Sequence, residues 1–431
     1  MKSLRILSLA LACLRFASVA FCQTAQQLAE LTASDGQNGD ELATSVAISG
    51  NVAVVGSPCA MIGSNRCQGA AYIFVKPAAG WGTTSTFVAK LTASDGAAGD
   101  AFGQAVAIGL DTVVVGAPFK TVNGEAQGEV YVFTKPATGW TSMTETARLN
   151  PSDAATTCSA SEYCLFGNSV GVSGSQVVVG VPGNIVNNHA NQGAVYVYVK
   201  PATGWTSTTQ VAKLSVSLGK TGDQLGISVS ISGDIVAAGA PNVNSKGAAY
   251  VFVRPTSGWR NASTPITTLT ASDGNQYDTF GWSLGVQDHI IVVGAPQFGN
   301  PQIGSQAPGK AYLYLGSNQL AELTPSDGNA GDNFGYSVAI GGNNVLIGSI
   351  LYPFDGSPNG TGKAYVFTKP ASGWTSSTET GTLLPSNAMA GDYVGHSVSL
   401  TGTGNTALVG APGHTDSGSF LYQGAAYVFV P

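Results

Sequence analysis

The stretch GDAFGQAVAIGLDTVVVGAP, residues 99–118, decides the fold, because both of its halves recur along the chain. The first half, a Phe-Gly pair just after an acidic turn, returns as GDNFGYSVAI at residues 331–340. The second half, an apolar run that ends in Gly-Ala-Pro, returns as VVGAP at residues 292–296. An aromatic segment follows each pair, as in GEVYVF at residues 128–133. The self-alignment gives seven copies, with a period of roughly 55 to 65 residues.

Each copy supplies four short strands. The run TVVVGA at residues 112–117 is apolar on both faces, which is typical of a strand packed between two neighbouring sheets. In the aromatic segment, Tyr131 and Phe133 share one face of a strand while valines share the other. The two remaining strands carry the Phe-Gly motif and an AKL or AEL motif, as at residues 89–91. With 57 glycines and only 10% charged residues, the composition also suits many short strands joined by tight turns.

The two ends of the chain favour a closed ring of sheets. The last copy stops at YVFVP, residues 427–431, without a fourth strand, and an orphan AQQLAELTAS, residues 25–34, precedes the first copy. Radial closure leaves no long sheet edge exposed. We therefore predict an all-β fold, a seven-bladed β-propeller of four-stranded antiparallel blades in which the N-terminal strand completes the last blade. The Phe-Gly strand should be innermost, with Phe filling the wedge between sheets and Gly allowing close backbone approach.

These motifs resemble FG-GAP repeats, the units of the N-terminal β-propeller of integrin α subunits and of many exported microbial proteins. The resemblance covers nearly the whole chain after its first residues. It implies a secreted or surface propeller that binds macromolecules, and it implies no reaction. One feature departs from the family: its calcium sites need an Asp-rich loop after the Phe-Gly strand, and here that connection is a short turn such as SGN, residues 49–51. Such turns lack the six or more oxygens that calcium needs, so we expect no metal site and no cofactor.

The first 22 residues are typical of an export signal. Lys2 and Arg5 form a basic start, residues 6–14 form an apolar centre, and Ala20 and Cys22 supply small side chains near the expected cleavage point. A disordered apolar leader is the alternative. We expect residues 23–431 to form a single propeller domain, secreted, extracellular or at the cell surface, or periplasmic in a bacterium.

The expected mature chain is acidic. Removal of three of the 18 basic residues with the signal would leave 15 against 24 acidic ones, a net charge of −9. This sign argues against a nucleic-acid partner. We expect a monomer without a transmembrane segment, and the partner should be an extracellular protein or a glycan.

Four cysteines remain beyond the expected signal. They form two close pairs, Cys59 with Cys67 and Cys158 with Cys164. In an oxidising compartment this spacing favours two local disulfides. A zinc site is the alternative, but its ligands would have to come from two distant loops.

Strand order sorts the loops onto two faces. One face receives uniform turns and the PATGW-like hairpins; the other, the variable face, receives the strand two-to-three loops and the blade-to-blade links, with both cysteine pairs. Variable loops on a rigid scaffold are the usual place for binding, although they can also be merely tolerated insertions. The residues that we expect on the partner-binding face are Phe119, Phe298, Tyr352, Phe354, His414, Phe420 and Tyr422.

Two repeated features of the sequence have both a functional and a structural interpretation. An acidic residue precedes the inner strand in nearly every copy, as at Asp100 and Asp332. These residues could form a ring that attracts a cation, but their repetition favours simple turn capping. The hairpin tryptophans, such as Trp140 and Trp205, could stack on sugars as in a lectin, or could pack over the outer strand.

Catalysis finds little support in the sequence. There is no Gly-x-Ser-x-Gly elbow, no His-Glu-x-x-His motif and no phosphate loop, and the four histidines lie in unrelated contexts. We therefore predict a non-enzymatic binding or adhesion propeller. The alternatives are a carbohydrate-binding lectin-type propeller and a hydrolase whose site the sequence does not reveal.

Overall fold

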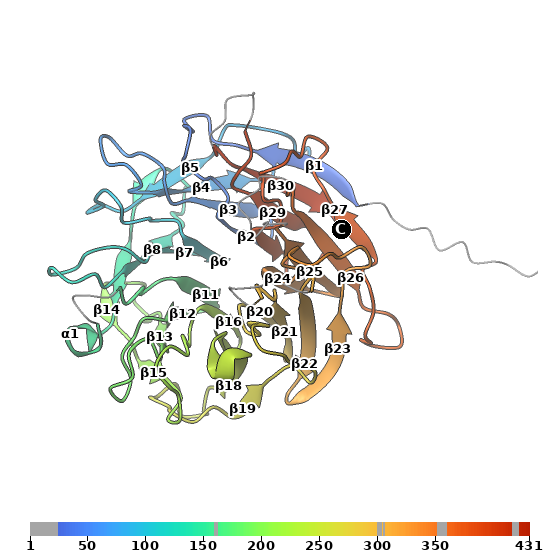
Figure 1. Ribbon diagram of the computed structural model, residues 1–431. Coiled ribbons are helices and arrows are strands. Elements are labelled where there is room, and N and C mark those ends of the chain that lie inside the picture. The colour runs from blue at the N-terminus through green and yellow to red at the C-terminus, as the bar shows by residue number, and fades with distance from the viewer. Residues whose placement is uncertain (1–24, 159–162, 300–303, 305–306, 351–359, 416–421) are drawn as a thin grey trace, which may run out of the picture.

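The computed structural model describes residues 25–158, 163–299, 304, 307–350, 360–415 and 422–431. These residues form seven β-sheets arranged as blades around a central axis (Figure 1). The predicted all-β, seven-bladed propeller is thus confirmed. The described helices are one turn each, α1 (Ala154–Thr157) and the 3-10 helix η1 (Val243–Ser245). None of the described helices has the length and apolar character needed to cross a membrane.

Each blade is an antiparallel sheet in which the strand order from the axis outward mostly follows the chain. Blade 1 consists of β2 (Ser45–Ser49), β3 (Val52–Ser57), β4 (Ala70–Val75) and β5 (Ala89–Thr92). Blade 2 consists of β6 (Ala105–Gly109), β7 (Thr112–Ala117), β8 (Glu129–Thr134) and β10 (Ala147–Asn150). Blade 3 consists of β11 (Ser169–Ser173), β12 (Gln176–Val181), β13 (Ala194–Val199) and β15 (Ala212–Leu214). Blade 4 consists of β16 (Ser228–Ser232), β17 (Ile235–Ala240), β18 (Ala248–Val253) and β19 (Thr267–Leu269). Blade 5 consists of β20 (Ser283–Gln287), β21 (Ile290–Ala295), β22 (Lys310–Leu315) and β23 (Asn318–Leu323). Blade 6 consists of β24 (Ser337–Gly341), β25 (Asn344–Ser349), β26 (Lys363–Thr368) and β27 (Gly381–Leu383). Blade 7 consists of β28 (Ser397–Leu400), β29 (Ala407–Ala411), β30 (Ala425–Val430) and β1 (Gln26–Leu31).

Blade 7 combines strands from the two ends of the described chain. β1 pairs antiparallel with β30, from Gln26 opposite Val430 to Leu31 opposite Ala426, with an irregularity between Gln27 and Ala29. β1 is therefore the outermost strand of a sheet whose other three strands come from the last 35 residues of the chain.

The outer edges of several blades are covered by a segment of the next blade, which we call the outer clamp. It follows the Trp hairpin and pairs in parallel with the outer strand of the preceding blade; in two cases it is a two-residue strand, β9 (Met143–Thr144) on β5 and β14 (Thr208–Thr209) on β10. Elsewhere it is an isolated bridge. These bridges join Thr84 to Leu31, Ala262 to Leu214 and Ser377 to Leu323. The clamp protects backbone groups that would otherwise form an open sheet edge.

The Phe-Gly and Gly-Ala-Pro motifs meet between neighbouring blades. A Cβ on Gly56, in the second motif of blade 1, would lie only 2.1 Å from the carbonyl oxygen of Gly103 in blade 2. The same carbonyl accepts a hydrogen bond of 2.7 Å from Ser45 Oγ of blade 1. The aromatic member, Phe102, is fully buried and packs among apolar side chains of blades 1 and 2. A Cβ on Gly103 itself would lie 2.4 Å from the Ala70 carbonyl oxygen of blade 1. The predicted roles of Phe102 and Gly103 are therefore confirmed.

Candidate functional site

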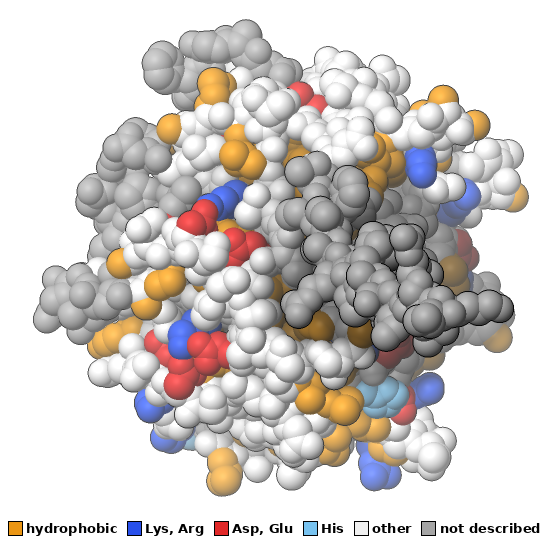
Figure 2. Space-filling model, turned by 90° about the vertical axis from the view of Figure 1, so that its right-hand side faces the viewer, with side chains coloured by type: hydrophobic (Ala, Val, Ile, Leu, Met, Phe, Trp, Pro, Cys, Tyr) orange, Lys and Arg blue, Asp and Glu red, His pale blue; other side chains and the backbone are white. Residues whose placement is uncertain are grey.

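The variable face is braced by both predicted disulfides. Cys59 is bonded to Cys67 within the β3–β4 loop, and Cys158 is bonded to Cys164 in the link from blade 2 to blade 3. Both crosslinks are local, as the sequence predicts, and each fixes a connection on the same face. On the side of the molecule in Figure 2, acidic and basic side chains lie in small mixed groups among neutral surface.

Aromatic side chains of the variable face reach solvent at several points. Phe119 is 41% exposed and packs edge-to-face against Tyr163, which is 53% exposed, with ring centroids 5.4 Å apart. Tyr422 is 43% exposed. Phe298 is half-buried, and its ring centroid lies 4.6 Å from that of Trp282. Of the expected face residues, Phe119 and Tyr422 thus contact solvent, whereas Phe298 packs against Trp282.

His414 departs from the expectation of a surface residue. Its side chain is only 2% exposed, because its Nδ1 lies 2.9 Å from Asp392 Oδ2 and its Nε2 lies 3.3 Å from Glu30 Oε1. The His414 ring therefore lies in the interior of blade 7 and is not part of the binding face. Three further expected face residues lie outside the described part of the chain: Tyr352, Phe354 and Phe420.

The repeated acidic residues are engaged by their own turns. Asp100 Oδ2 accepts a hydrogen bond of 2.7 Å from the Ala97 backbone N–H, and Asp332 accepts one of 2.8 Å from Asn329. Both aspartates are buried, and burial raises the pKa of Asp332. The turn-capping interpretation is the one that these contacts support. The same bond recurs at Asp40, Asp223, Asp278 and Asp392.

A second set of aspartates, a few residues earlier, binds the tyrosine of the following aromatic strand. Asp327, for example, accepts a hydrogen bond of 2.8 Å from Tyr365 and pairs with Lys363, whose hydrogen bond lowers the pKa of that carboxyl. Asp95, Asp153 and Asp273 make the equivalent tyrosine contact. These carboxylates stabilise individual blades. In the described residues, no group of three or more His, Cys, Asp or Glu side chains is placed to hold a metal ion.

The side chains of the hairpin tryptophans pack against the blades. Trp140 and Trp205 are each 5% exposed, and Trp81, Trp259 and Trp374 pack against the apolar clusters of blades. The last three are half-buried. The sugar-platform interpretation therefore loses its support at Trp140 and Trp205, because a ring covered by the core offers no face to a ligand.

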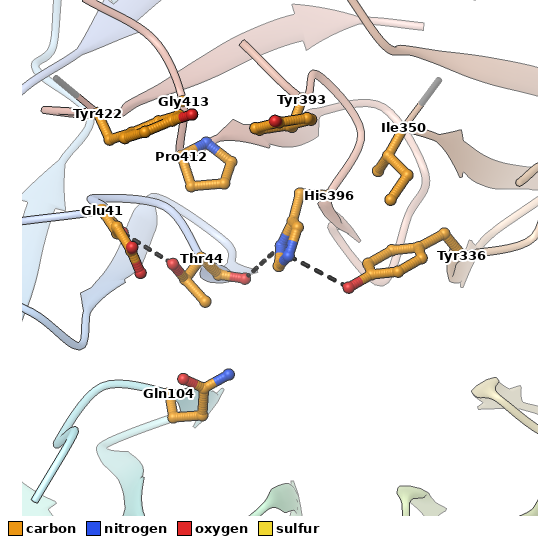
Figure 3. Close-up of a pocket in the computed structure, with 10 residues that line it drawn as sticks. All are labelled: Glu41, Thr44, Gln104, Tyr336, Ile350, Tyr393, His396, Pro412, Gly413 and Tyr422. Atoms are coloured by element: carbon orange, nitrogen blue, oxygen red, sulfur yellow. Dashed lines mark hydrogen bonds between the residues drawn. The ribbon is translucent and has the colours of Figure 1, made fainter. Parts of the chain in front are cut away.

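A cavity of about 370 Å³ lies at the axial end of the variable face, between residues of blades 1, 2, 6 and 7 (Figure 3). His396 connects two of its walls: Nδ1 lies 3.0 Å from the Thr44 carbonyl oxygen and Nε2 lies 3.3 Å from the Tyr336 hydroxyl. Burial lowers the pKa of His396, so the ring is neutral near pH 7. Because a carbonyl oxygen only accepts, Nδ1 carries the proton and Nε2 accepts from Tyr336.

The opposite part of the cavity is polar. Glu41 and Gln104 contribute a carboxylate and an amide, and burial raises the pKa of the Glu41 carboxyl. Three other lining residues are aromatic: Tyr336, Tyr393 and Tyr422. The cavity can therefore offer ring faces and hydrogen-bonding groups to one small ligand.

Sequence reasoning missed this cavity, although the repeat alignment holds a signal for it. The residue directly after the Phe-Gly pair is polar or aliphatic in blades 1 to 4 and aromatic in blades 5 to 7. In chain order these residues are Thr44, Gln104, Asn168, Ile227, Trp282, Tyr336 and His396. A residue type that the propeller fold requires would be the same in all blades. The aromatic residues at this position in blades 5 to 7 therefore indicate a site on that side of the axis.

The architecture and the repeats define the class of the protein, a seven-bladed propeller whose sequence repeat is out of phase with its blades. The FG-GAP repeat model matches seven segments, and each unites the outer strand of one blade with the three inner strands of the next. The chain belongs to the FG-GAP repeat family. No curated protein is significantly similar to the chain in sequence. The matched segments are residues 25–74, 85–133, 143–198, 208–252, 264–314, 318–367 and 377–429.

Proposed function

We propose that this chain is an exported, non-enzymatic binding propeller that presents its variable face to an extracellular protein or glycan. One observation carries the proposal: exposed aromatic side chains and disulfide-braced loops gather on that face, whereas the hairpin tryptophans on the other face are packed into the blades. The FG-GAP propeller is consistent with a binding or adhesion role. The signal-like residues 1–22 and the disulfides support export.

The centre of the proposed interaction is the aromatic pair Phe119 and Tyr163. Both rings are exposed, and Tyr163 directly precedes the disulfide-bonded Cys164, so the pair is held in place before a partner arrives. Rigid aromatic side chains give large contact area at low entropic cost, which is why they dominate the energetics of interfaces.

The test is a pull-down from the extracellular material of the source organism with immobilised residues 23–431. The double variant Phe119→Ser with Tyr163→Ser should lose the captured partner while keeping its melting temperature. The matched control is Leu110→Asn, since Leu110 is 84% exposed in the β6–β7 turn on the opposite face. Equal capture by all three proteins, or loss in the control, would contradict the proposed face.

A further inference from the structure

One side of the axial cavity carries a continuous set of aromatic rings, which we call the aromatic arc: Phe298, Trp282, Tyr336 and His396. The centroid of Trp282 lies 4.6 Å from that of Phe298 and 5.8 Å from that of Tyr336, which in turn lies 5.1 Å from His396. The arc belongs to blades 5 to 7, so the sevenfold architecture does not require it. Its members are half-buried; Tyr336 and His396 line the cavity, and Trp282 and Phe298 continue the set of rings beyond its lining.

Two further tyrosines form a flat wall. The rings of Tyr393 and Tyr422 are nearly parallel, with an angle of 14° between their planes and centroids 6.4 Å apart. Figure 3 shows the two rings edge-on and side by side, with Glu41, Thr44 and Gln104 below them. Because Tyr422 is 43% exposed, the wall opens to solvent.

This combination of groups fits a pyranose ring. The C–H groups on one face of a sugar carry slight positive charge and pack on the negative face of an aromatic ring, whereas its hydroxyls lie around the rim. A carboxylate accepts from two neighbouring hydroxyls, and an amide both donates and accepts. Glu41 and Gln104 supply these two groups within the same cavity. A volume of about 370 Å³ suits one or two sugar units and excludes a folded protein.

A compact organic cation is the competing ligand, since it too is drawn to aromatic faces beside a carboxylate. Such a cation is best held by ring faces on several sides, whereas the rings of the two wall tyrosines are nearly parallel to each other. His396 is neutral, and burial raises the pKa of Glu41, which weakens the negative charge of the cavity under mildly acidic conditions. The arrangement of the two tyrosine rings therefore favours a sugar ring, which stacks by one face, over a compact cation.

We propose that the axial cavity binds a glycan, with one pyranose unit stacked on the wall of Tyr393 and Tyr422 and its hydroxyls bonded to Glu41 and Gln104. This inference rests on the proposed binding function and gives it a ligand class. The hairpin tryptophans have no part in it.

The experiment is a glycan array with residues 23–431, followed by titration calorimetry with the best sugar. Tyr422→Ala should weaken binding at least about tenfold, because it removes a stacking face worth roughly 1.4 kcal/mol or more. Tyr422→Phe, the matched control, keeps the ring and should bind within about threefold of the unchanged protein. Glu41→Gln should weaken binding of a neutral sugar while retaining measurable affinity.

Several results would overturn the inference. These are an array without a hit, a sugar whose affinity is unchanged by Tyr422→Ala, or displacement of the sugar by tetramethylammonium together with complete loss of binding in Glu41→Gln, which would identify a cation site. If no glycan binds and a partner is still captured through Phe119 and Tyr163, this inference fails and the proposed function stands. If neither glycan nor partner binds, both fail.

Discussion

A serine at the start of the inner strand ties neighbouring blades together. Ser45 Oγ donates to the Gly103 carbonyl, and Ser397 Oγ of blade 7 donates to the Ala43 carbonyl of blade 1 at 2.8 Å, so the contact also joins the last blade to the first. Blade 2 has Ala105 at this position, and the carbonyl of Gly167 lacks this partner. The equivalent bonds are made by Ser169, Ser228, Ser283 and Ser337.

Replacing Ala105 by Ser should stabilise the protein. The new hydroxyl would reach the Gly167 carbonyl in the way that Ser45 reaches Gly103, which is worth about 0.5–1.5 kcal/mol. Ser45→Ala should lower stability by a similar amount. Urea unfolding of both variants measures the effect, and a destabilised Ala105→Ser protein would show that blade 2 lacks the space the other blades have.

His414 links strands that are remote in the sequence. Its partners are Asp392 in the link to blade 7 and Glu30 on β1. Burial by itself lowers the pKa of His414, but the hydrogen bonds and charges of these two carboxylates raise it to about 9. The hydrogen bond from His414 in turn lowers the pKa of Glu30. The sequence could predict the acidic turn around Asp392 but not this contact, since no local pattern indicates which loop residue meets β1.

The ion pair of His414 predicts a loss of stability at alkaline pH. A histidine whose pKa rises from 6.5 to about 9 on folding stabilises the native state fully below pH 6.5, and the contribution, on the order of 3 kcal/mol, disappears as pH rises through 9. His414→Gln should therefore destabilise the protein at about pH 6 much more than at about pH 9.5. Urea unfolding at both pH values measures this, with His289→Gln in the exposed β20–β21 turn as control. An unchanged pH profile in His414→Gln would refute the ion pair.

At the level of elements, the strands were predictable and the outer clamps were not. Strand identity follows from local alternation of side chains, and seven copies make that signal strong. The clamp depends on pairing between residues of different blades, as when the Thr84 N–H donates to the Glu30 carbonyl at 2.9 Å. Its sequence, a polar stretch after a Trp hairpin, is typical of any loop, so its partner emerges only once the blades are placed side by side.

β1 is the element on which ring closure is expected to depend. Leu31 is fully buried, Ala29 is 1% exposed, and the strand covers the outer edge of β30. Deleting residues 25–34 should expose that edge and cost on the order of 5 kcal/mol, because it removes buried apolar side chains as well as strand pairing. We expect aggregation or a markedly lower melting temperature, measured by light scattering and differential scanning calorimetry.

A circular permutant is the matched control for this deletion. It begins at residue 35 and carries residues 25–34 after Pro431, joined by a short hairpin, so that blade 7 becomes continuous. It should regain monomeric behaviour and most of the lost stability. A truncated protein that stays monomeric with an unchanged melting temperature would refute closure by β1, and so would a permutant no more stable than the truncation.

For the whole molecule, the propeller follows from the sequence because its determinants are repeated, whereas the site follows from departures from the repeat. Phe102 and Gly103 have counterparts in other blades, so their packing could be inferred from the alignment. Tyr336 and His396 differ from their counterparts, and a difference alone does not say which side chains face one cavity. Tyr422 lies far along the chain from Glu41, and only the closed ring brings both to the same axial opening.

Calcium gives the last test at this scale, because the sequence predicts that this chain lacks the calcium sites of the propellers that its repeats resemble. Calcium needs six or more oxygen ligands, but the carboxylates of the acidic turns already make local contacts. Asp100 accepts a hydrogen bond from the Ala97 N–H and pairs with Lys120, and Asp95 accepts one from Tyr131 and pairs with Arg148. A site bound only in the native state would add about 2.7 kcal/mol at a hundredfold excess of calcium over its dissociation constant. We therefore expect melting temperatures in millimolar EDTA and millimolar calcium to agree within about two degrees. A rise of several degrees with calcium, abolished by Asp100→Asn, would show that the acidic links are cation sites after all.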